Sequence, residues 1–109
     1  MNWKITTTLA ALMISGLACT AADAQATWDS TCAKCHGKTG DGKTKMGAKL
    51  GIKDYTDASV QAEMKDEEMF KAIKEGVKKD GKTLMKAYGS TLSDDEIKAL
   101  VAHVRSLKK

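Results

Sequence analysis

The stretch of sequence that decides the fold is Cys32-Ala33-Lys34-Cys35-His36. Two cysteines separated by two residues on a helical turn can present both sulfur atoms to one flat ligand, and the adjacent histidine can point its imidazole at the centre of that ligand. This C-x-x-C-H spacing is the attachment pattern of a c-type haem. It predicts that Cys32 and Cys35 form thioether bonds to one haem and that Nε2 of His36 ligates the iron.

Three other uses of the cysteine pair compete with haem attachment. A thioredoxin-like redox pair is expected beside a βαβ pattern, which the sequence lacks. A structural zinc site needs four ligands, and residues 27–109 offer only His103 as a further histidine or cysteine outside the motif. A disulfide between Cys32 and Cys35 would close too small a loop to stabilise the fold much. Haem attachment is therefore the favoured interpretation.

The N-terminus has the features of an export signal. Residues 1–4 form a short positive region, and residues 5–18 form an apolar run that is too short to span a bilayer. Small residues at positions 22, 24 and 26 predict cleavage after Ala24 or Ala26. We therefore expect a signal peptide over residues 1–26, a single domain over residues 27–109, and a periplasmic location.

Two alternatives to this processing remain open. One is a retained amphipathic anchor, although Asp23 and Gln25 would end a membrane helix early. The other is lipid attachment at Cys19, because Gly16-Leu17-Ala18 before it loosely resembles a lipoprotein acylation site.

The composition of the predicted mature chain leaves room for a large cofactor. The chain has a net charge of +4, with acids and bases evenly mixed, which does not indicate nucleic-acid binding. Aromatic residues make up only 5% of the sequence, and so small a domain often needs a metal, disulfide or cofactor to hold it together. A haem would supply the missing apolar core.

The pattern of residues predicts an all-α fold with long loops. A short helix is expected from Ala26 to His36, followed by a glycine-rich loop, irregular chain over residues 43–57 and a short helix after Asp57. Acids at Asp66-Glu67-Glu68 open a further helix that Gly76 ends. The last helix follows the capping-box sequence Ser93-Asp94-Asp95-Glu96, with apolar residues at helical spacing up to Leu107. No segment shows the alternation of a β-strand, and residues 78–89 are expected to be a loop.

Methionine is the predicted second axial ligand of the iron, because its sulfur suits an electron carrier and raises the reduction potential. Met85 lies in the predicted loop between two helices, where the chain can fold across the open face of a haem. Met69 lies on an apolar helical stripe and is more simply a core residue. His103 is the rival ligand, but a lone histidine beside an apolar stripe is more often a packed helix residue.

With these residues identified, the chain resembles the class I c-type cytochromes of the small monohaem bacterial kind. The resemblance rests on residues 32–37, on the Gly40 to Gly42 loop, on residues 68–76 and on residues 85–107. It implies that residues 27–109 form a cytochrome c domain, with three to five helices wrapped around one covalently bound haem and with the N- and C-terminal helices packed together.

The chain departs from the family pattern because it contains no proline. Gly47-Ala48 stands where the family has Gly-Pro, and the carbonyl of Ala48 is expected to accept the hydrogen bond from the proximal histidine. Lys86 stands where proline often follows the ligand methionine, which predicts a looser Met85 loop.

The function predicted from these features is one-electron transfer between redox partners, with the iron cycling between Fe(III) and Fe(II) and no bond-making catalysis. The chain is thus not expected to be an enzyme, and it is expected to be a monomer. Lysines in segments near the predicted haem face could steer docking to an acidic partner surface, although an ordinary solvated face would look the same: Lys34, Lys38, Lys78, Lys79, Lys82 and Lys86. The alternative function is a haem sensor or catalytic haem protein whose weak sixth ligand leaves to admit a small molecule.

Overall fold

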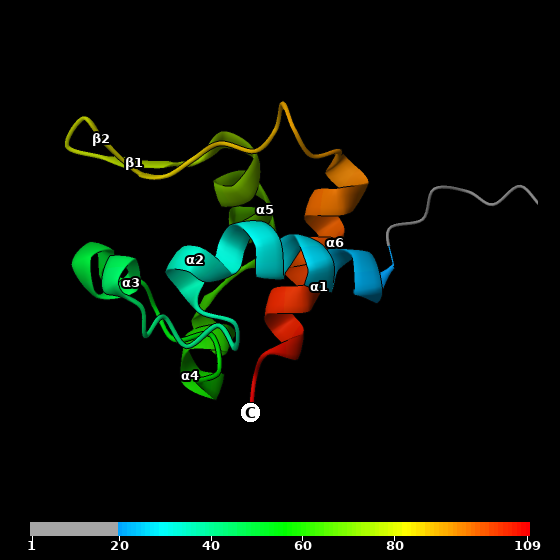
Figure 1. Ribbon diagram of the computed structural model, residues 1–109, viewed down its shortest axis with the longest axis horizontal. Coiled ribbons are helices and arrows are strands. Elements are labelled where there is room, and N and C mark those ends of the chain that lie inside the picture. The colour runs from blue at the N-terminus through cyan, green and yellow to red at the C-terminus, as the bar shows by residue number, and fades with distance from the viewer. Residues whose placement is uncertain (1–19) are drawn as a thin grey trace, which may run out of the picture.

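The mostly helical structure that the sequence predicts is confirmed by a computed structural model, which describes residues 20–109 (Figure 1). The predicted signal region up to Cys19 lies outside the described residues. The elements in chain order are α1 (Ala21–Thr27), the π-helical segment η1 (Trp28–Cys32), α2 (Ala33–His36), α3 (Lys45–Leu50), α4 (Ala58–Glu63), α5 (Asp66–Glu75), β1 (Val77–Lys79), β2 (Lys82–Met85) and α6 (Asp94–Ser106).

The first three elements follow one another without a break and form one helix that carries the cysteine motif at its C-terminal end. The predicted helix over residues 26–36 is therefore confirmed, but it begins earlier, at Ala21. Its start is set by a capping box in which the Thr20 hydroxyl and the Asp23 carboxylate each accept a backbone N–H of the other residue. Gly37, with φ of 85°, ends the helix directly after His36.

Helix α6 forms where the sequence predicts it and packs across the N-terminal helix (Figure 1). Ser93 and Glu96 form its capping box, and three acids in its first turn favour the helix dipole. The predicted contact between the two terminal helices is thus confirmed. The core between α1, α5 and α6 consists of the buried residues Ala24, Ile73, Ile97, Leu100 and Val101.

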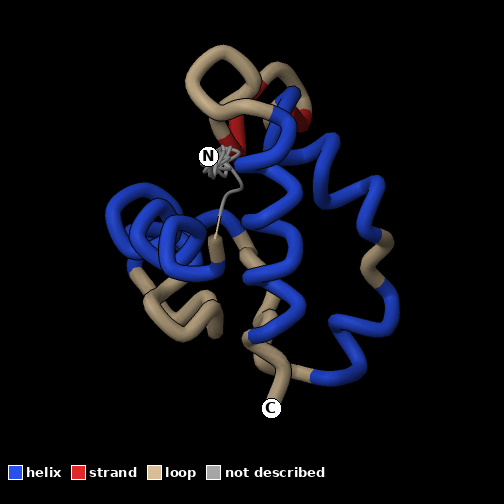
Figure 2. The backbone as a smooth tube through the Cα atoms, turned by 90° about the vertical axis from the view of Figure 1, so that its right-hand side faces the viewer, coloured by secondary structure: helices blue, strands red, loops and turns tan. Residues whose placement is uncertain are grey.

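The expectation that residues 78–89 form a loop is wrong in part, because β1 and β2 pair as an antiparallel hairpin. Lys79 pairs with Lys82, so Asp80 and Gly81 form a two-residue turn, with φ of 52° and 75°. Positive φ at both positions is the type I′ turn that Asp-Gly sequences favour. The hairpin lies at the end of the molecule opposite the C-terminus (Figure 2).

The segment expected to be irregular, residues 43–57, contains the short helix α3. The Thr44 side chain caps its start by accepting the Gly47 N–H, and Gly51 ends it in the left-handed conformation. The expected short helix after Asp57 is confirmed as α4, which the Asp57 side chain caps. Within residues 20–109 no helix has the length and apolar character needed to cross a membrane.

Candidate functional site

The cysteine motif lies at the mouth of a cavity of about 330 Å³. Cys32, Cys35 and His36 line the cavity from the end of the N-terminal helix. Leu84 and Met85 line it from β2. The structure therefore brings together the four side chains that the sequence singles out as haem-binding residues. The cavity is completed by Thr31, Leu50, Ile52, Lys53, Tyr55, Ala72, Val77, Lys86 and Tyr88.

The imidazole of His36 is held between two aromatic side chains. Its ring centroid lies 5.3 Å from that of Tyr55, in a stacked arrangement, and 5.5 Å from that of Trp28. Trp28 is itself fixed, because its indole N–H donates to the carbonyls of Gly37 and Lys38 at 3.1 and 3.2 Å. Burial lowers the pKa of His36 below its ordinary value, which favours the neutral form that ligates metals.

The expected hydrogen bond from His36 to the carbonyl of Ala48 is not formed. The Nδ1 atom of His36 is buried without a hydrogen-bond partner. The loop beside the motif is instead held by Thr44, whose hydroxyl donates to the carbonyl of Cys35 at 2.6 Å while it accepts from Gly47. A Cβ at Gly47 would collide with the carbonyl oxygens of Gly42 and Cys35, so this close approach requires glycine.

The two cysteines are free and part-buried, so they do not form a disulfide. Burial, together with the neighbouring Cys35, raises the pKa of the Cys32 thiol to about 11. A catalytic redox pair needs the opposite shift, because its nucleophile is a thiolate at neutral pH. Among the described residues, no three His, Cys, Asp or Glu side chains are grouped so that they could hold a metal ion. Neither the redox nor the zinc interpretation gains support.

Met85 ends β2, is half-buried, and lines the same cavity as the cysteine motif. It also lines a small cavity of about 70 Å³ together with His36, Tyr55 and Met69. Met69 packs against the core, as the sequence predicts. The position of Met85 depends on Gly76, where a Cβ would lie 2.6 Å from the Met85 carbonyl oxygen.

His103 lies outside this cavity, which agrees with its interpretation as a packed helix residue. It is 9% exposed, and its ring centroid lies 5.2 Å from that of Trp28. Its Nε2 atom is buried without a hydrogen-bond partner. Both histidines therefore contact Trp28, in an aromatic row that runs from His103 through Trp28 and His36 to Tyr55.

The protein-family model described as "Cytochrome C oxidase, cbb3-type, subunit III" matches residues 20–104. The chain belongs to this family of c-type cytochromes. The solved structure titled "KustC0563 c-type cytochrome" is similar to the cytochrome, with 34% sequence identity, a TM-score of 0.70, and coverage of 79% of this chain and 98% of that one. A mutant of that protein gives a TM-score of 0.67 at 32% identity, covering 79% and 99% of the two chains. The comparison with curated proteins finds no match.

Membership of the family implies a covalently bound haem, and the residues present in the cytochrome fit that group. Two free thiols and a neutral imidazole lie together at an apolar cavity. The Nδ1 atom of His36 has no partner, so the hydrogen bond that usually orients a ligating histidine is not formed, and the ring contacts Trp28 and Tyr55 instead. The family also supports the coarse function of a haem-based electron carrier.

The structure adds two tyrosines to the site that no motif or apolar period in the sequence indicates. Tyr55 and Tyr88 both line the cavity, and burial raises the pKa of each phenol, with a smaller contribution from Cys32. Neither residue lies in a periodic apolar stripe. Only the fold, which brings the segment before α4 and the segment after β2 to one cavity, reveals them.

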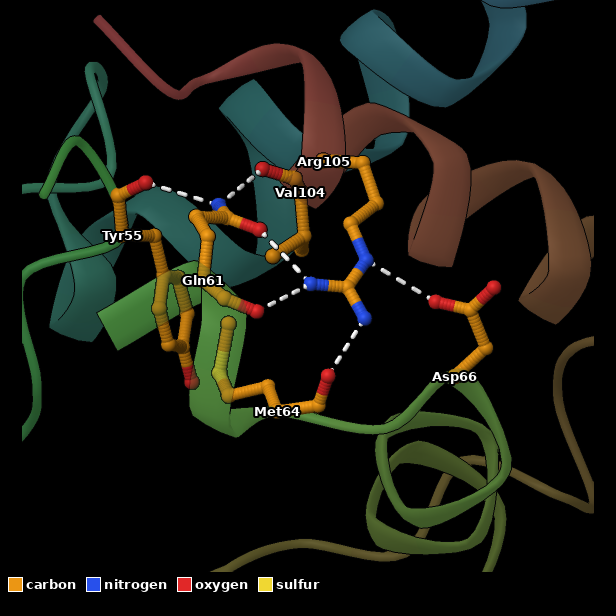
Figure 3. A network of polar contacts seen from close by, with 6 residues as sticks. All are labelled: Tyr55, Gln61, Met64, Asp66, Val104 and Arg105. Carbon is orange, nitrogen blue, oxygen red and sulfur yellow. Dashed lines mark hydrogen bonds and ion pairs between the residues drawn. The ribbon is translucent and has the colours of Figure 1, made fainter. Parts of the chain in front are cut away.

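Tyr55 is tied to the C-terminal helix by a buried polar network (Figure 3). Gln61 is 4% exposed, and its amide donates to the carbonyls of Tyr55 and Val104 at 2.7 and 2.8 Å. Arg105 donates to the side-chain oxygen of Gln61, to two backbone carbonyls and to Asp66. The network connects α6 to the residue that stacks on His36.

A larger hollow, of about 600 Å³, lies beside α5 and α6. Phe70, Val101 and Ala102 contribute its apolar lining, and charged side chains surround them. It contains no cysteine, histidine or methionine. We therefore assign no part of the haem site to this hollow.

Proposed function

We propose that this cytochrome carries one electron at a time between redox partners, on a single haem c bonded to Cys32 and Cys35 with His36 and Met85 as axial ligands. The observation that carries the proposal is the single cavity that these four residues line, three from the end of the N-terminal helix and one from β2. When bound, the haem supplies an iron that alternates between Fe(III) and Fe(II).

The residues around the proposed ligands keep them in place. Trp28 and Tyr55 both contact the His36 ring and limit its rotation. Gly76 and the β1–β2 hairpin set the position of Met85. Because His36 and Met85 would both ligate the iron, no open coordination site would be left for a substrate, and we infer that the cytochrome is not an enzyme.

Lysines near the cavity support docking to an acidic protein surface. Lys53 and Lys86 line the cavity, and Lys78, Lys79 and Lys82 are exposed on the adjoining hairpin. Positive charge beside the cavity would speed the encounter with a negatively charged partner, and it would make the association rate depend on salt. We infer that one face of the monomer, centred on this hairpin, serves the electron donor and acceptor.

We further infer that the chain is exported to the periplasm by its N-terminal segment. The positive region over residues 1–4 and the apolar run that follows it support this inference. Its first check is the presence of the haem-loaded protein in the periplasmic fraction of a host that has haem-attachment machinery.

The optical spectrum of the ferric haem-loaded protein tests the axial ligands. We expect the weak far-red band of sulfur-to-iron ligation, its loss in Met85→Ala, and its retention in Met46→Ala, a control at a residue that is 39% exposed and away from the cavity. A haem spectrum without this band in the unmodified protein would reject Met85 as ligand and favour a sensor or catalytic haem protein. A colourless protein would reject the haem altogether.

A further inference from the structure

The folded domain begins upstream of both cleavage sites that the sequence predicts. Helix α1 starts at Ala21, and its capping box pairs Thr20 with Asp23 through hydrogen bonds of 3.1 and 3.2 Å. Cleavage after Ala24 would remove both members of the box. Cleavage after Ala26 would leave the N-terminal helix without its first turns.

Ala24 is also part of the core. It is 4% exposed and packs in the cluster of α5 and α6 that includes Ile97 and Leu100. Its carbonyl accepts the backbone N–H of Trp28, the residue that contacts His36. Loss of Ala24 would therefore uncover core side chains and free the turn that holds Trp28.

The same α1 residues cover His103. A small hollow of about 180 Å³ is lined by Ala21 and Ala24 from α1 and by Ala99, Ala102, His103 and Ser106 from α6. Without residues 21–24, the buried His103 ring would face solvent on this side. The match to the family also starts at residue 20, which is the N-cap of α1.

We propose that the export signal is cut between Ala18 and Cys19, so that the mature chain begins at Cys19 and keeps the whole of α1. This inference rests on the proposed export of the protein. Ala18 and Gly16 are the first and third residues before this bond, and these are the two positions that a signal peptidase requires to be small. Residues 1–18 also fall within the usual length of a signal peptide. A lipoprotein peptidase would cut the same bond, so both enzymes leave Cys19 as the first residue.

The test is the intact mass and N-terminal sequence of the haem-loaded protein, made from the full precursor in a host with export and haem-attachment machinery. We expect a chain that begins at Cys19, and an added diacylglycerol mass on that chain would support the same boundary and identify the lipoprotein route. A chain that begins at Gln25 or Thr27 would overturn the proposed boundary while leaving export intact. An uncleaved chain starting at Met1 would overturn both.

Two variants make the assignment independent of later trimming. Ala18→Gln removes the small residue before the proposed bond, and we expect the product that begins at Cys19 to disappear. The matched control Ala22→Gln/Ala26→Gln blocks both downstream sites through exposed residues and leaves the buried Ala24 untouched. We expect the mature chain of this control still to begin at Cys19. Loss of the product that begins at Cys19 in this control would overturn the proposal.

Discussion

Replacement of Gly76 by alanine should weaken the hold of Met85 on the iron. Gly76 has φ of 77° and ψ of 179°, a conformation that is essentially restricted to glycine. A Cβ there would lie 2.6 Å from the carbonyl oxygen of Met85 and 2.9 Å from the backbone nitrogen of Ala87. Both atoms belong to backbone, so the chain that carries the proposed ligand must move.

The magnitude follows from the backbone strain and the collision together. Strain of this kind costs about 1–3 kcal/mol. With the displaced backbone added, we expect Gly76→Ala to lower the free energy of unfolding by about 3 kcal/mol, which corresponds to a fall in Tm of about 12–24 °C for a domain of this size. We also expect the far-red band of the ferric protein to weaken or vanish.

The hairpin offers a matched control at Gly81. This residue has nearly the same φ, 75°, but a Cβ there would meet no atom within 4 Å. Gly81→Ala should therefore cost only about 1 kcal/mol and leave the far-red band unchanged. If the two substitutions change the far-red band equally, or if neither changes it, the reasoning that Gly76 positions Met85 is refuted.

Three further predictions concern the support of the site. Gln61→Leu removes the amide that donates to the carbonyls of Tyr55 and Val104, and it removes one acceptor of Arg105. It should cost about 2–4 kcal/mol in denaturant unfolding, against under about 0.5 for the exposed control Ala62→Leu; a cost below about 1 kcal/mol would contradict the network. Burial lowers the pKa of His103 below 6.5, opposed in part by Asp29, so the unfolded chain binds the proton first and stability should fall as pH drops below about 6.5. His103→Leu should weaken this dependence of stability on pH in the haem-loaded protein. If the dependence is unchanged, another group causes it. Ile97→Ala, at a side chain with no exposed surface, should cost about 2–5 kcal/mol by thermal unfolding, and a smaller loss would show that the core collapses around the gap.

The parts of the fold that could be predicted from sequence are those set by local chemistry. The capping box at Ser93 and the apolar spacing after it locate α6 to within a residue or two, because both signals act over one helical turn. The acids of α5 and the glycine that ends it are equally local. The cysteine motif is the extreme case, since five adjacent residues specify a cofactor.

The hairpin has a clear turn sequence between strands that show no periodic pattern. Asp80-Gly81 is a strong two-residue turn, but the strands beside it are short and rich in exposed lysine, so they lack the alternation that normally identifies strands. The sequence does not predict α3 for a similar reason, because glycine interrupts its six residues. In both cases the turn or cap residue was informative, while the periodicity was not.

The support of His36 could not be predicted, because it depends on contacts between segments far apart in the chain. Gln61 reaches across 43 residues to the carbonyl of Val104. Tyr55 reaches His36 only because this network and the turn before α4 hold it there. No local sequence pattern predicts contacts between residues so far apart, and a single buried polar residue forms no periodic pattern.

These contacts also divide the site between two parts of the chain. The His36 side depends on both chain ends, because Trp28 lies between His36 and the α6 residue His103, and Ala24 packs α1 onto α6. The Met85 side depends on the middle of the chain, through Gly76 and the hairpin. Damage to the terminal crossing should therefore loosen the proximal ligand and the fold together, whereas damage at Gly76 should first affect the sulfur ligand. Because the His36 side depends on α1, the position at which the export signal is cut affects how firmly His36 is held.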